Sequence, residues 1–213
     1  MSLLPLFPLP NVVLFPDVLL PLHIFEPRYR DMVADALESD RRIGMVLLRA
    51  GHESEYEGRP PVYDVGCSGV MVHSSRLEDG RYNIVLRGLD RFRVVSENHE
   101  RAYRRAIVAP LSDPVLDTGA HAALKGTRAA IESRLGLMKA TSDDLGPSLA
   151  TQLAAMPDED FVHTLAHYLD FEPIEKQMLL ERASILQRAE ALAELLEMKH
   201  AHSTLPNTPD VRH

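Results

Sequence analysis

Five prolines near the start of the chain constrain its fold more than any other feature. They stand in an apolar segment rich in Leu, Val, Ile and Phe, at positions 5, 8, 10, 16 and 21. Proline lacks an amide donor and interrupts helices, and the first Lys or Arg is Arg28, so the segment fits neither a membrane helix nor an export signal. Since proline is accepted at strand ends and sheet edges, we expect short strands that begin a sheet, followed by a helix from about Pro27.

The composition is that of a folded protein with one substantial core or two small ones. The chain has 213 residues, of which 45% are hydrophobic, and we expect two packed subdomains. Its single cysteine, Cys67, allows no internal disulfide, which together with the lack of an export signal indicates a cytoplasmic protein. We expect Cys67 to be a small buried residue rather than a nucleophile.

Apolar runs separated by Gly, Pro, Asp and Ser predict seven short strands, which favours a barrel. The runs are 19–25, 43–48, 62–68, 70–73, 82–87, 92–97 and 103–108. One helix is expected among them, from about Pro27 to Ser39, because Tyr29, Met32, Val33, Ala36 and Leu37 recur with helical spacing. We expect this helix to cover one end of the barrel.

The pattern becomes helical from Thr118, after a loop that contains a proline and two aspartates. Helices are expected over about 118–138, 145–155, 158–170 and 173–201. In the last of these an apolar stripe is expected to face the core, formed by Ile174, Met178, Ala183, Leu186, Leu192 and Leu196. The predicted organisation is a barrel subdomain over 1–112, a helical subdomain over 113–202 and a flexible tail over 203–213.

Two blocks of sequence resemble the N-terminal, substrate-binding domain of the Lon protease family. The first comprises Pro5 to Pro16 (PLFPLPNVVLFP) and Leu19 to Arg30 (LLPLHIFEPRYR), in which Asp17 stands where the family usually has Gly. The second comprises Val65 to Val70 (VGCSGV) and Asp79 to Val94 (DGRYNIVLRGLDRFRV). The resemblance implies an α+β protein, with a small PUA-like β-barrel that carries one short helix and is followed by a C-terminal helical bundle.

The resemblance also implies substrate recognition without the family's enzymatic parts. Lon enzymes add an ATPase with a G-x-x-x-x-G-K-[ST] phosphate loop and a protease with a Ser–Lys dyad. Gly126, Gly136 and Gly146 are not followed by Lys, and we find neither enzymatic part. We therefore expect no catalytic residue, no metal and no cofactor.

The segment from His23 to Tyr29 supplies the candidate peptide-binding residues: His23, Phe25, Glu26, Arg28 and Tyr29. Strand alternation places His23 and Phe25 on one side and Ile24 on the other, so one of these faces could open onto a groove that bears Glu26 and Arg28. In the alternative interpretation Phe25 and Tyr29 fill the core and Glu26 pairs with a sheet arginine such as Arg87. We favour this second interpretation because most motif residues of a scaffold serve packing.

Three functions are consistent with the sequence. The leading one is a noncatalytic module that binds unfolded or extended polypeptide segments through apolar patches and an exposed sheet edge, alone or with a protease or adaptor partner. The second is an RNA-binding module that uses the arginine-rich sheet over residues 81–105, with Arg87, Arg91, Arg93, Arg104 and Arg105 as contacts. The third is an unrecognised enzyme or a sensor with a small-ligand pocket.

Charge bears on this choice. The formal net charge is −8, which disfavours nonspecific nucleic-acid binding, yet residues 76–105 contain eight arginines against five acids. The oligomeric state stays open.

Two histidines are the strongest metal-ligand candidates. His163 and His167 lie four residues apart and share one face of an expected helix. A zinc-protease motif would place Glu after the first His, whereas Thr164 stands there, and no third ligand is evident. We therefore interpret both as structural.

Overall fold

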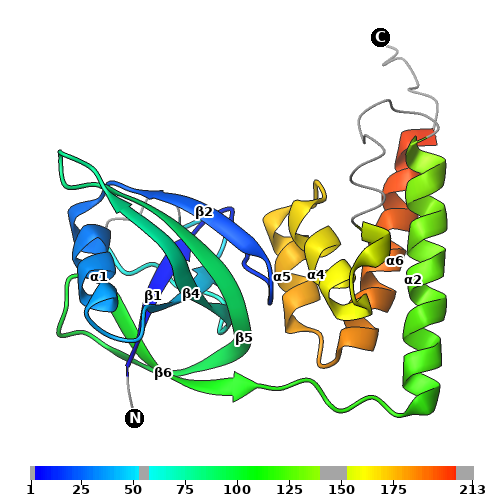
Figure 1. The fold of residues 1–213 in the computed structure, drawn as a ribbon, viewed down its shortest axis with the longest axis horizontal. Coiled ribbons are helices and arrows are strands. Elements are labelled where there is room, and N and C mark those ends of the chain that lie inside the picture. Colours follow the sequence, from blue (N-terminus) through cyan, green and yellow to red (C-terminus); the bar gives the residue numbers. More distant parts are fainter. Residues whose placement is uncertain (1–2, 53–57, 140–152, 205–213) are drawn as a thin grey trace, which may run out of the picture. The chain divides into compact units, whose positions relative to one another are not determined.

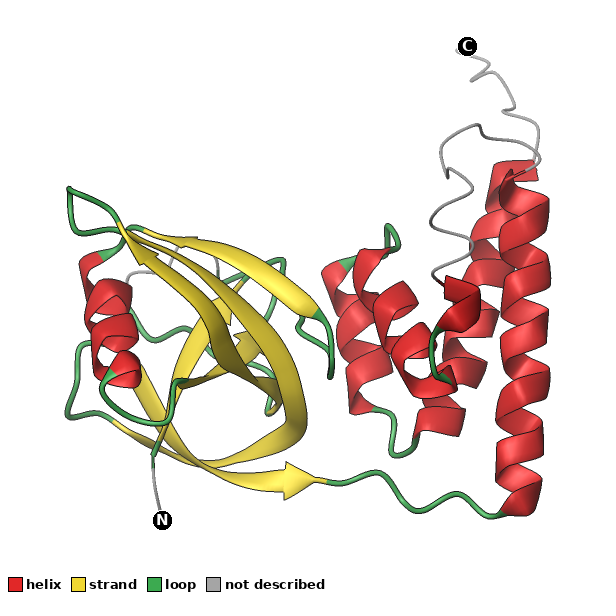
Figure 2. Cartoon of the chain, in the orientation of Figure 1, coloured by secondary structure: helices red, strands yellow, loops and turns green. Residues whose placement is uncertain are grey.

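The computed structural model describes residues 3–52, 58–139 and 153–204, and shows an α+β protein with a curved sheet followed by helices (Figures 1 and 2). The strands are β1 (Leu4–Leu9), β2 (Leu19–Ile24), β3 (Arg42–Leu47), β4 (Val65–Arg76), β5 (Tyr82–Asn98) and β6 (Arg104–Leu111). The helices are α1 (Pro27–Leu37), α2 (Thr118–Lys139), α4 (Asp158–Tyr168), α5 (Pro173–Glu181) and α6 (Ile185–Thr204).

Five of the six strands close into a barrel. The sheet order is β2-β5-β4-β3-β1-β6, and β6 also pairs with β5. The pairing of β1 with β3 is parallel, and the others are antiparallel. The first half of β5 pairs with β2 and its second half with β6, so β2 lies outside the closed ring. In the described part of the chain β2 pairs with β5 alone and is an edge strand.

The number of strands differs from the prediction because glycines bend strands here instead of ending them. Gly69 lies inside the continuous strand β4 and Gly88 inside β5, where the sequence predicted two strands each. Register shifts in the β4–β5 ladder, between Cys67 and Gly69 and between Met71 and His73, accommodate the bends as bulges. The first strand, Leu4–Leu9, was not among the seven predicted runs, because Pro5 and Pro8 interrupt its pattern.

Helix α1 agrees with the prediction in its start and its buried face. Pro27 occupies the first turn, where its missing amide donor costs nothing, and Glu26 is the N-cap residue. Tyr29, Met32, Val33 and Ala36 are buried. In Figure 1 this helix lies at one end of the barrel, as expected.

The crossing of residues 15–17 over β5 sets the position of β2. The amide of Asp17 donates to the carbonyl of Gly88 at 3.1 Å, and the amide of Gly88 donates to the carbonyl of Val18 at 2.9 Å. A Cβ atom on Gly88 would meet the carbonyl oxygen of Phe15 at 2.0 Å, so only glycine fits there. Asp17 has φ 59°, the left-handed conformation that favours glycine, which explains why the family usually has Gly at this position.

The described chain divides by packing into two compact units. One comprises the barrel with residues 163–182, and the other comprises the described residues of 115–162 and 183–204. The division falls within α4, between Val162 and His163, and groups α5 with the barrel. These units describe how tightly the residues pack and do not test where the domains divide. The predicted domain boundary at residue 112 therefore stays a prediction.

In the helical unit α2 packs against α6, and Arg128 of α2 organises the turn before α4. Its guanidinium donates to the carbonyl oxygens of Leu153 and Met156 at 2.9 and 2.7 Å, and to Asp158 at 2.8 Å. The same group lies 4.4 Å from the ring centre of Phe161. One partly buried cation thus holds several carbonyl groups at helix ends, where they lack intrahelical donors.

The prediction of one helix over 173–201 is wrong. The chain leaves helical geometry at Arg182, which has ψ 137°, and α6 begins at Ile185. Ser184 caps α6 by accepting the amide of Gln187, and the Gln187 side chain accepts the amide of Ala183. This arrangement resembles a capping box, except that Gln187 accepts the amide one residue before the cap, and the sequence pattern Ser-x-x-Gln was its signal. The predicted stripe fails in its first half for the same reason: Ile174 and Met178 are exposed, while Leu192 and Leu196 are buried.

The expected helix 145–155 lies mostly outside the described residues, which resume at 153, and so does the predicted tail beyond Thr204. The last predicted strand, 103–108, lies close to β6, which begins one residue later and ends three residues later than expected.

A pair of glycine substitutions tests the strand crossing. We expect Gly88→Ala to lower the free energy of unfolding by at least about 2 kcal/mol, since the new methyl group overlaps a backbone carbonyl that cannot retreat without moving β2. Gly126→Ala is the matched control, because a Cβ atom there meets nothing within 4 Å in the exposed middle of α2. That control should be neutral or stabilising by about 0.5–1 kcal/mol. Urea unfolding followed by circular dichroism measures both, and equal effects would refute the role assigned to Gly88.

Candidate functional site

The exposed face of strands β2, β5 and β4 carries several of the apolar side chains that the barrel leaves in solvent. Three ladder rows define it, in which directly opposed residues share one side of the sheet. They are Leu19–Arg87–Val70–Arg42, Pro21–Val85–His73 and His23–Asn83–Ser75. We call this surface, with Phe25 and Val72, the β2 face. Its members alternate with buried residues such as Leu20, Ile24 and Ile84.

Three large apolar residues of the β2 face are strongly exposed. Leu19 has 48% of its surface accessible, Phe25 61% and Val72 51%. Val72 is exposed because the bulge between Met71 and His73 places two β4 residues opposite Val85. Exposed large apolar residues that gather on one side of a sheet are typical of an interaction site.

Polar side-chain contacts hold the β2 face in place at the C-terminal end of β2. His23 lies 2.7 Å from the side-chain oxygen of Asn83 and 3.1 Å from the Arg81 guanidinium. Arg81 in turn pairs with Asp79, and the amide and guanidinium of Arg81 hold the pKa of that carboxyl below its usual value. The rings of His23 and Phe25 stack with centres 6.3 Å apart, so Phe25 is oriented although it is exposed.

The free edge of β2 is less available to a partner strand than its face. Because Val18 accepts the amide of Gly88, the alternation of an antiparallel pair points the backbone groups of Leu19, Pro21 and His23 away from β5. The carbonyl of Leu19 already accepts the hydroxyl of Tyr168 at 3.1 Å. Pro21 has no amide hydrogen to donate. Both features are protections that edge strands carry against pairing.

The five predicted peptide-binding residues do not form one surface. His23 and Phe25 lie on the β2 face as the alternation predicted, but Tyr29 is 3% exposed and packs against Phe7 at 4.5 Å. Glu26 pairs with Arg28 at 3.0 Å, and Arg28 lies over the Tyr29 ring. The favoured packing interpretation is therefore right for Tyr29 and wrong for the other two: Phe25 is in solvent, and the partner of Glu26 is not Arg87.

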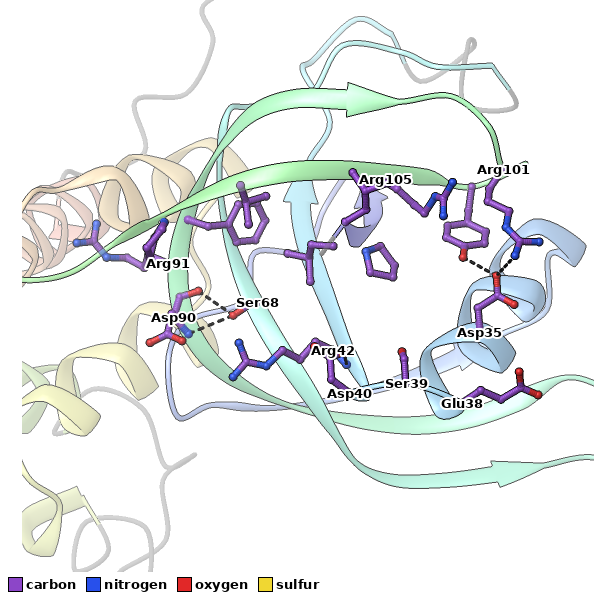
Figure 3. Close-up of a pocket in the computed structure, with 17 residues that line it drawn as sticks. Asp35, Glu38, Ser39, Asp40, Arg42, Ser68, Asp90, Arg91, Arg101 and Arg105 are labelled. Carbon is purple, nitrogen blue, oxygen red and sulfur yellow. Dashed lines mark hydrogen bonds and ion pairs between the residues drawn. The ribbon is translucent and has the colours of Figure 1, made fainter. Parts of the chain in front are cut away.

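A groove of about 740 Å³ is lined by residues of β1, β3, β4, β5, β6 and α1 and of the turn between β5 and β6 (Figure 3). Leu4, Phe92, Val108 and Pro110 give it an apolar part, and the end of α1 and the β5–β6 turn supply polar walls. Its arginines are Arg42, Arg91, Arg101 and Arg105, and its acids are Asp35, Glu38, Asp40 and Asp90. Arg42 belongs both to this groove and to the first row of the β2 face.

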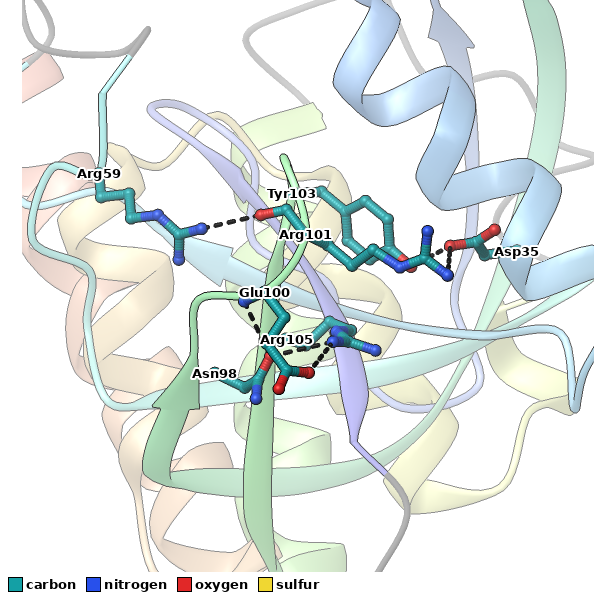
Figure 4. Close-up of polar contacts among 7 residues, drawn as sticks. All are labelled: Asp35, Arg59, Asn98, Glu100, Arg101, Tyr103 and Arg105. Carbon is teal, nitrogen blue, oxygen red and sulfur yellow. Dashed lines mark hydrogen bonds and ion pairs between the residues drawn. The ribbon is translucent and has the colours of Figure 1, made fainter.

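The turn between β5 and β6 is held from two sides (Figure 4). Tyr103 donates its hydroxyl to Asp35 of α1 at 2.6 Å, and Arg101 pairs with the same carboxylate at 3.6 Å. Burial, followed by the hydrogen bond to Asp35, raises the pKa of Tyr103 to about 12. From the other side Arg59 donates to the carbonyl of Arg101 at 2.9 Å. The groove wall is thus a fixed structure, and Arg101 is engaged in it.

The five arginines predicted for RNA contact are divided between the interior and the surface. Arg91 is 4% exposed and donates to the carbonyls of Leu180 and Arg182, and it pairs with Asp113. Arg104 is 6% exposed, donates to the carbonyl of Pro60 and pairs with Glu97 at 3.3 Å. Burial lowers the pKa of Arg104.

The other three are more accessible. Arg105 is partly buried and binds Asn98 and Glu100, both at 3.0 Å. Only Arg87 and Arg93 of the five are exposed in the described structure. They lie on different halves of the bent strand β5, so the five arginines do not form one continuous basic surface.

The histidine and cysteine candidates have structural roles. His163 is buried, with its ring centre 6.2 Å from that of Phe15, and His167 contacts the carbonyl of Val13 through Nδ1 at 3.0 Å. Among the described residues no group of three His, Cys, Asp or Glu side chains could hold a metal ion. Cys67 is fully buried, as expected, and its burial raises the pKa of its thiol.

Most residues of the β2 face were not among the predicted contacts, and Leu19, Val72 and Arg42 show why. Leu19 shares the alternation of His23 and Phe25, so the sequence contained its signal. Val72 and Arg42 depend on the bulge in β4 and on the pairing of β3 with β4, which are long-range features.

The structure is similar to solved N-terminal domains of Lon proteases. The N-terminal domain of a Lon protease from the Mycobacterium avium complex aligns with a TM-score of 0.68 at 15% identity, over 92% of this chain and 98% of that one. A Lon N-terminal domain protein from Xanthomonas campestris aligns with a TM-score of 0.57 at 22% identity, over 97% of this chain and 100% of that one. The chain therefore has the α+β fold of this class of domains.

Sequence comparison gives the family. The model of the ATP-dependent protease La (LON) substrate-binding domain matches residues 3–198, and the chain belongs to this family. Lon protease 2 of Myxococcus xanthus is 29% identical over 98% of this chain, and Lon protease of Escherichia coli K12 is 24% identical over 91%. The chain spans about a quarter of the length of these relatives, 25% and 24% respectively. None of the described helices is long and apolar enough to cross a membrane.

Two arginine variants separate a structural role from a surface role. We expect Arg91→Gln to lower the free energy of unfolding by about 3–5 kcal/mol, because it leaves two carbonyls and the Asp113 carboxylate without their buried cation. Arg93→Gln, two residues further along β5 where the side chain is exposed, should change it by less than about 0.5 kcal/mol. Chemical denaturation measures both. Similar small effects from the two variants would contradict the interior role of Arg91.

His167 makes stability depend on pH. Burial lowers its pKa, so the unfolded chain binds a proton more readily than the folded one. The stability that neutral His167 contributes should therefore be present above the pKa of an unfolded histidine, about 6.5, and be lost as the pH falls below it. We expect His167→Gln to reduce the loss of stability between pH 7.5 and 5.5. Denaturation midpoints at both pH values measure this, and an unchanged pH dependence would exclude His167 as its source.

Proposed function

We propose that this protein is a noncatalytic recognition module that binds exposed apolar or extended polypeptide segments on the β2 face. The observation that carries the proposal is the exposure of Leu19, Phe25 and Val72 on one side of three paired strands. Membership of a substrate-binding domain family supports a recognition role. The proposal includes a cytoplasmic location, and it leaves open whether the module delivers its clients to a protease or adaptor.

The physical basis is the burial of apolar surface on a preformed platform. Complete burial of one large apolar side chain contributes about 1.5–3 kcal/mol, and association itself costs several kcal/mol. Three such residues support weak, reversible binding, which suits a module that must accept many segments. Because strands β2, β4 and β5 are already paired into a sheet, the protein loses little conformational entropy when a segment binds.

We further propose that binding uses the side-chain face and not strand addition to the β2 edge. Strand addition needs a run of free amides and carbonyls. On β2 the carbonyl of Leu19 is taken by Tyr168, and Pro21 lacks its amide hydrogen. A segment would gain few backbone hydrogen bonds there, whereas the face offers several side chains.

The RNA-binding alternative is less well supported by the contacts of its arginines. Arg91 and Arg104 are inside, Arg105 is engaged, and the two exposed arginines lie on different halves of β5. Phosphate contacts would make binding fall steeply with salt. Measuring the binding of a single-stranded RNA at two salt concentrations tests this alternative directly.

The test of the proposal compares two exposed apolar residues. Phe25→Ser should weaken binding of a fluorescent, reduced and carboxyamidomethylated α-lactalbumin, which stays unfolded, by about tenfold or more, since one large side chain leaves the platform. Val95→Ser is the control, because Val95 is 62% exposed but lies on the other half of β5, outside the β2 face. Fluorescence anisotropy gives both dissociation constants.

Three outcomes contradict the proposal in different ways. If the unaltered chain does not bind the unfolded protein at micromolar concentration, the recognition role fails. If Phe25→Ser and Val95→Ser weaken binding equally, the β2 face is not the site. If a peptide with N-methylated backbone amides binds much more weakly than its unmethylated form, strand addition is the mode instead of face binding.

A further inference from the structure

We infer that the β2 face selects apolar segments that carry acidic residues, and discriminates against segments that carry lysine or arginine. This inference rests on the proposed function and specifies the chemistry of the segments bound. It follows from the charges on the face, which differ in sign from the net charge of the chain.

The three strand segments that form the face contain no acidic residue. Residues 19–25, 70–76 and 82–87 include two arginines and two histidines but neither Asp nor Glu. The whole chain has a formal net charge of −8, with 31 acids against 23 basic residues. The absence of acids over these strands therefore departs from the composition of the molecule.

Two arginines of the first row flank Val70. Arg87 of β5 and Arg42 of β3 are both directly opposite Val70 of β4, so they share its side of the sheet. Both are exposed, and neither guanidinium forms an ion pair within the described residues. Two strand spacings separate their backbones by about 10 Å. They provide two cationic positions with apolar Val70 between them.

Several acids lie around the face, and two of them form ion pairs. Asp79 pairs with Arg81, and Glu26 pairs with Arg28. Asp40 accepts the amide of Arg42, and Asp90 lies in the groove with Ser68 hydrogen-bonded to its backbone. Asp17 precedes Leu19 at one corner of the face. A bound segment over the middle of the face would therefore meet Arg87 and the apolar residues before it meets a free carboxylate.

Apolar contact and charge reinforce each other at such a surface. When Phe25 and Leu19 are covered by a ligand, water leaves the region and the attraction between a nearby carboxylate and Arg87 is screened less. A lysine in the same position would be repelled at close range. The preference for acidic over basic segments therefore arises both from the attraction between Arg87 and a carboxylate and from the repulsion between Arg87 and a lysine.

The experiment uses three synthetic peptides and the full chain. Each peptide has the same four Phe and Val residues and differs only at the intervening positions, which are all Glu, all Gln or all Lys. At low salt we expect the Glu peptide to bind about two- to fivefold more tightly than the Gln peptide for each arginine engaged, the range that exposed ion pairs give. The Lys peptide should bind most weakly, and the order should compress as salt rises.

Charge-removal variants locate the effect. Arg87→Gln, alone and with Arg42→Gln, should reduce the preference for Glu over Gln, measured as the ratio of the two dissociation constants for each variant. Arg93→Gln is the matched control, since Arg93 is an exposed arginine on the other half of β5. It should leave the preference unchanged.

The outcomes distinguish this inference from the proposed function. If all three peptides bind equally and Phe25→Ser weakens all of them, the β2 face binds polypeptides without charge selection and the inference is wrong. If Arg93→Gln removes the preference as fully as Arg87→Gln, the selectivity comes from the general field of the protein and not from the β2 face. If none of the peptides binds the unaltered chain, the proposed function itself fails.

Discussion

The close approach of residues 15–17 to Gly88 is the constraint on which the candidate site depends. With no room for a Cβ atom at Gly88, the chain crosses β5 there and enters β2 through the left-handed Asp17. The hydrogen bond from Gly88 to Val18 then sets the register of β2, and a shift of one residue would exchange Leu20 and Ile24 for Leu19 and His23 in the core. Residues 15–17 and Gly88, about 70 residues apart in the sequence, thus set the position of β2 together.

The sequence predicts local features of this fold well and long-range ones poorly. The start of α1 at Pro27 follows from local chemistry, and so does the position of most strands. The continuity of β4 and β5 does not, because a glycine that ends one strand can bend another when a neighbour pairs across it. The break before α6 was readable from Ser184 and Gln187, but the apolar period of 173–201 concealed it.

The candidate site shows the same division. Alternation correctly predicts that His23 and Phe25 share a side, yet the exposure of that side depends on β2 being an edge strand outside the closed ring. Likewise, the sequence pattern around an arginine of β5 does not show whether its side chain is buried or exposed. The carbonyls of Leu180 and Arg182, some 90 residues away, are what hold Arg91 inside, and no local pattern announces them.

A module that exposes apolar strands must avoid pairing with copies of itself, and this requirement links the edge of β2 to its face. Pro21 and the Tyr168 hydroxyl block backbone pairing along the edge, so the apolar face can remain open without offering a free ladder. The arginines have a matching effect, because two copies that met through this face would bring like charges together. The same residues that would favour acidic segments therefore disfavour self-association, and a surface with both properties can stay exposed and still bind.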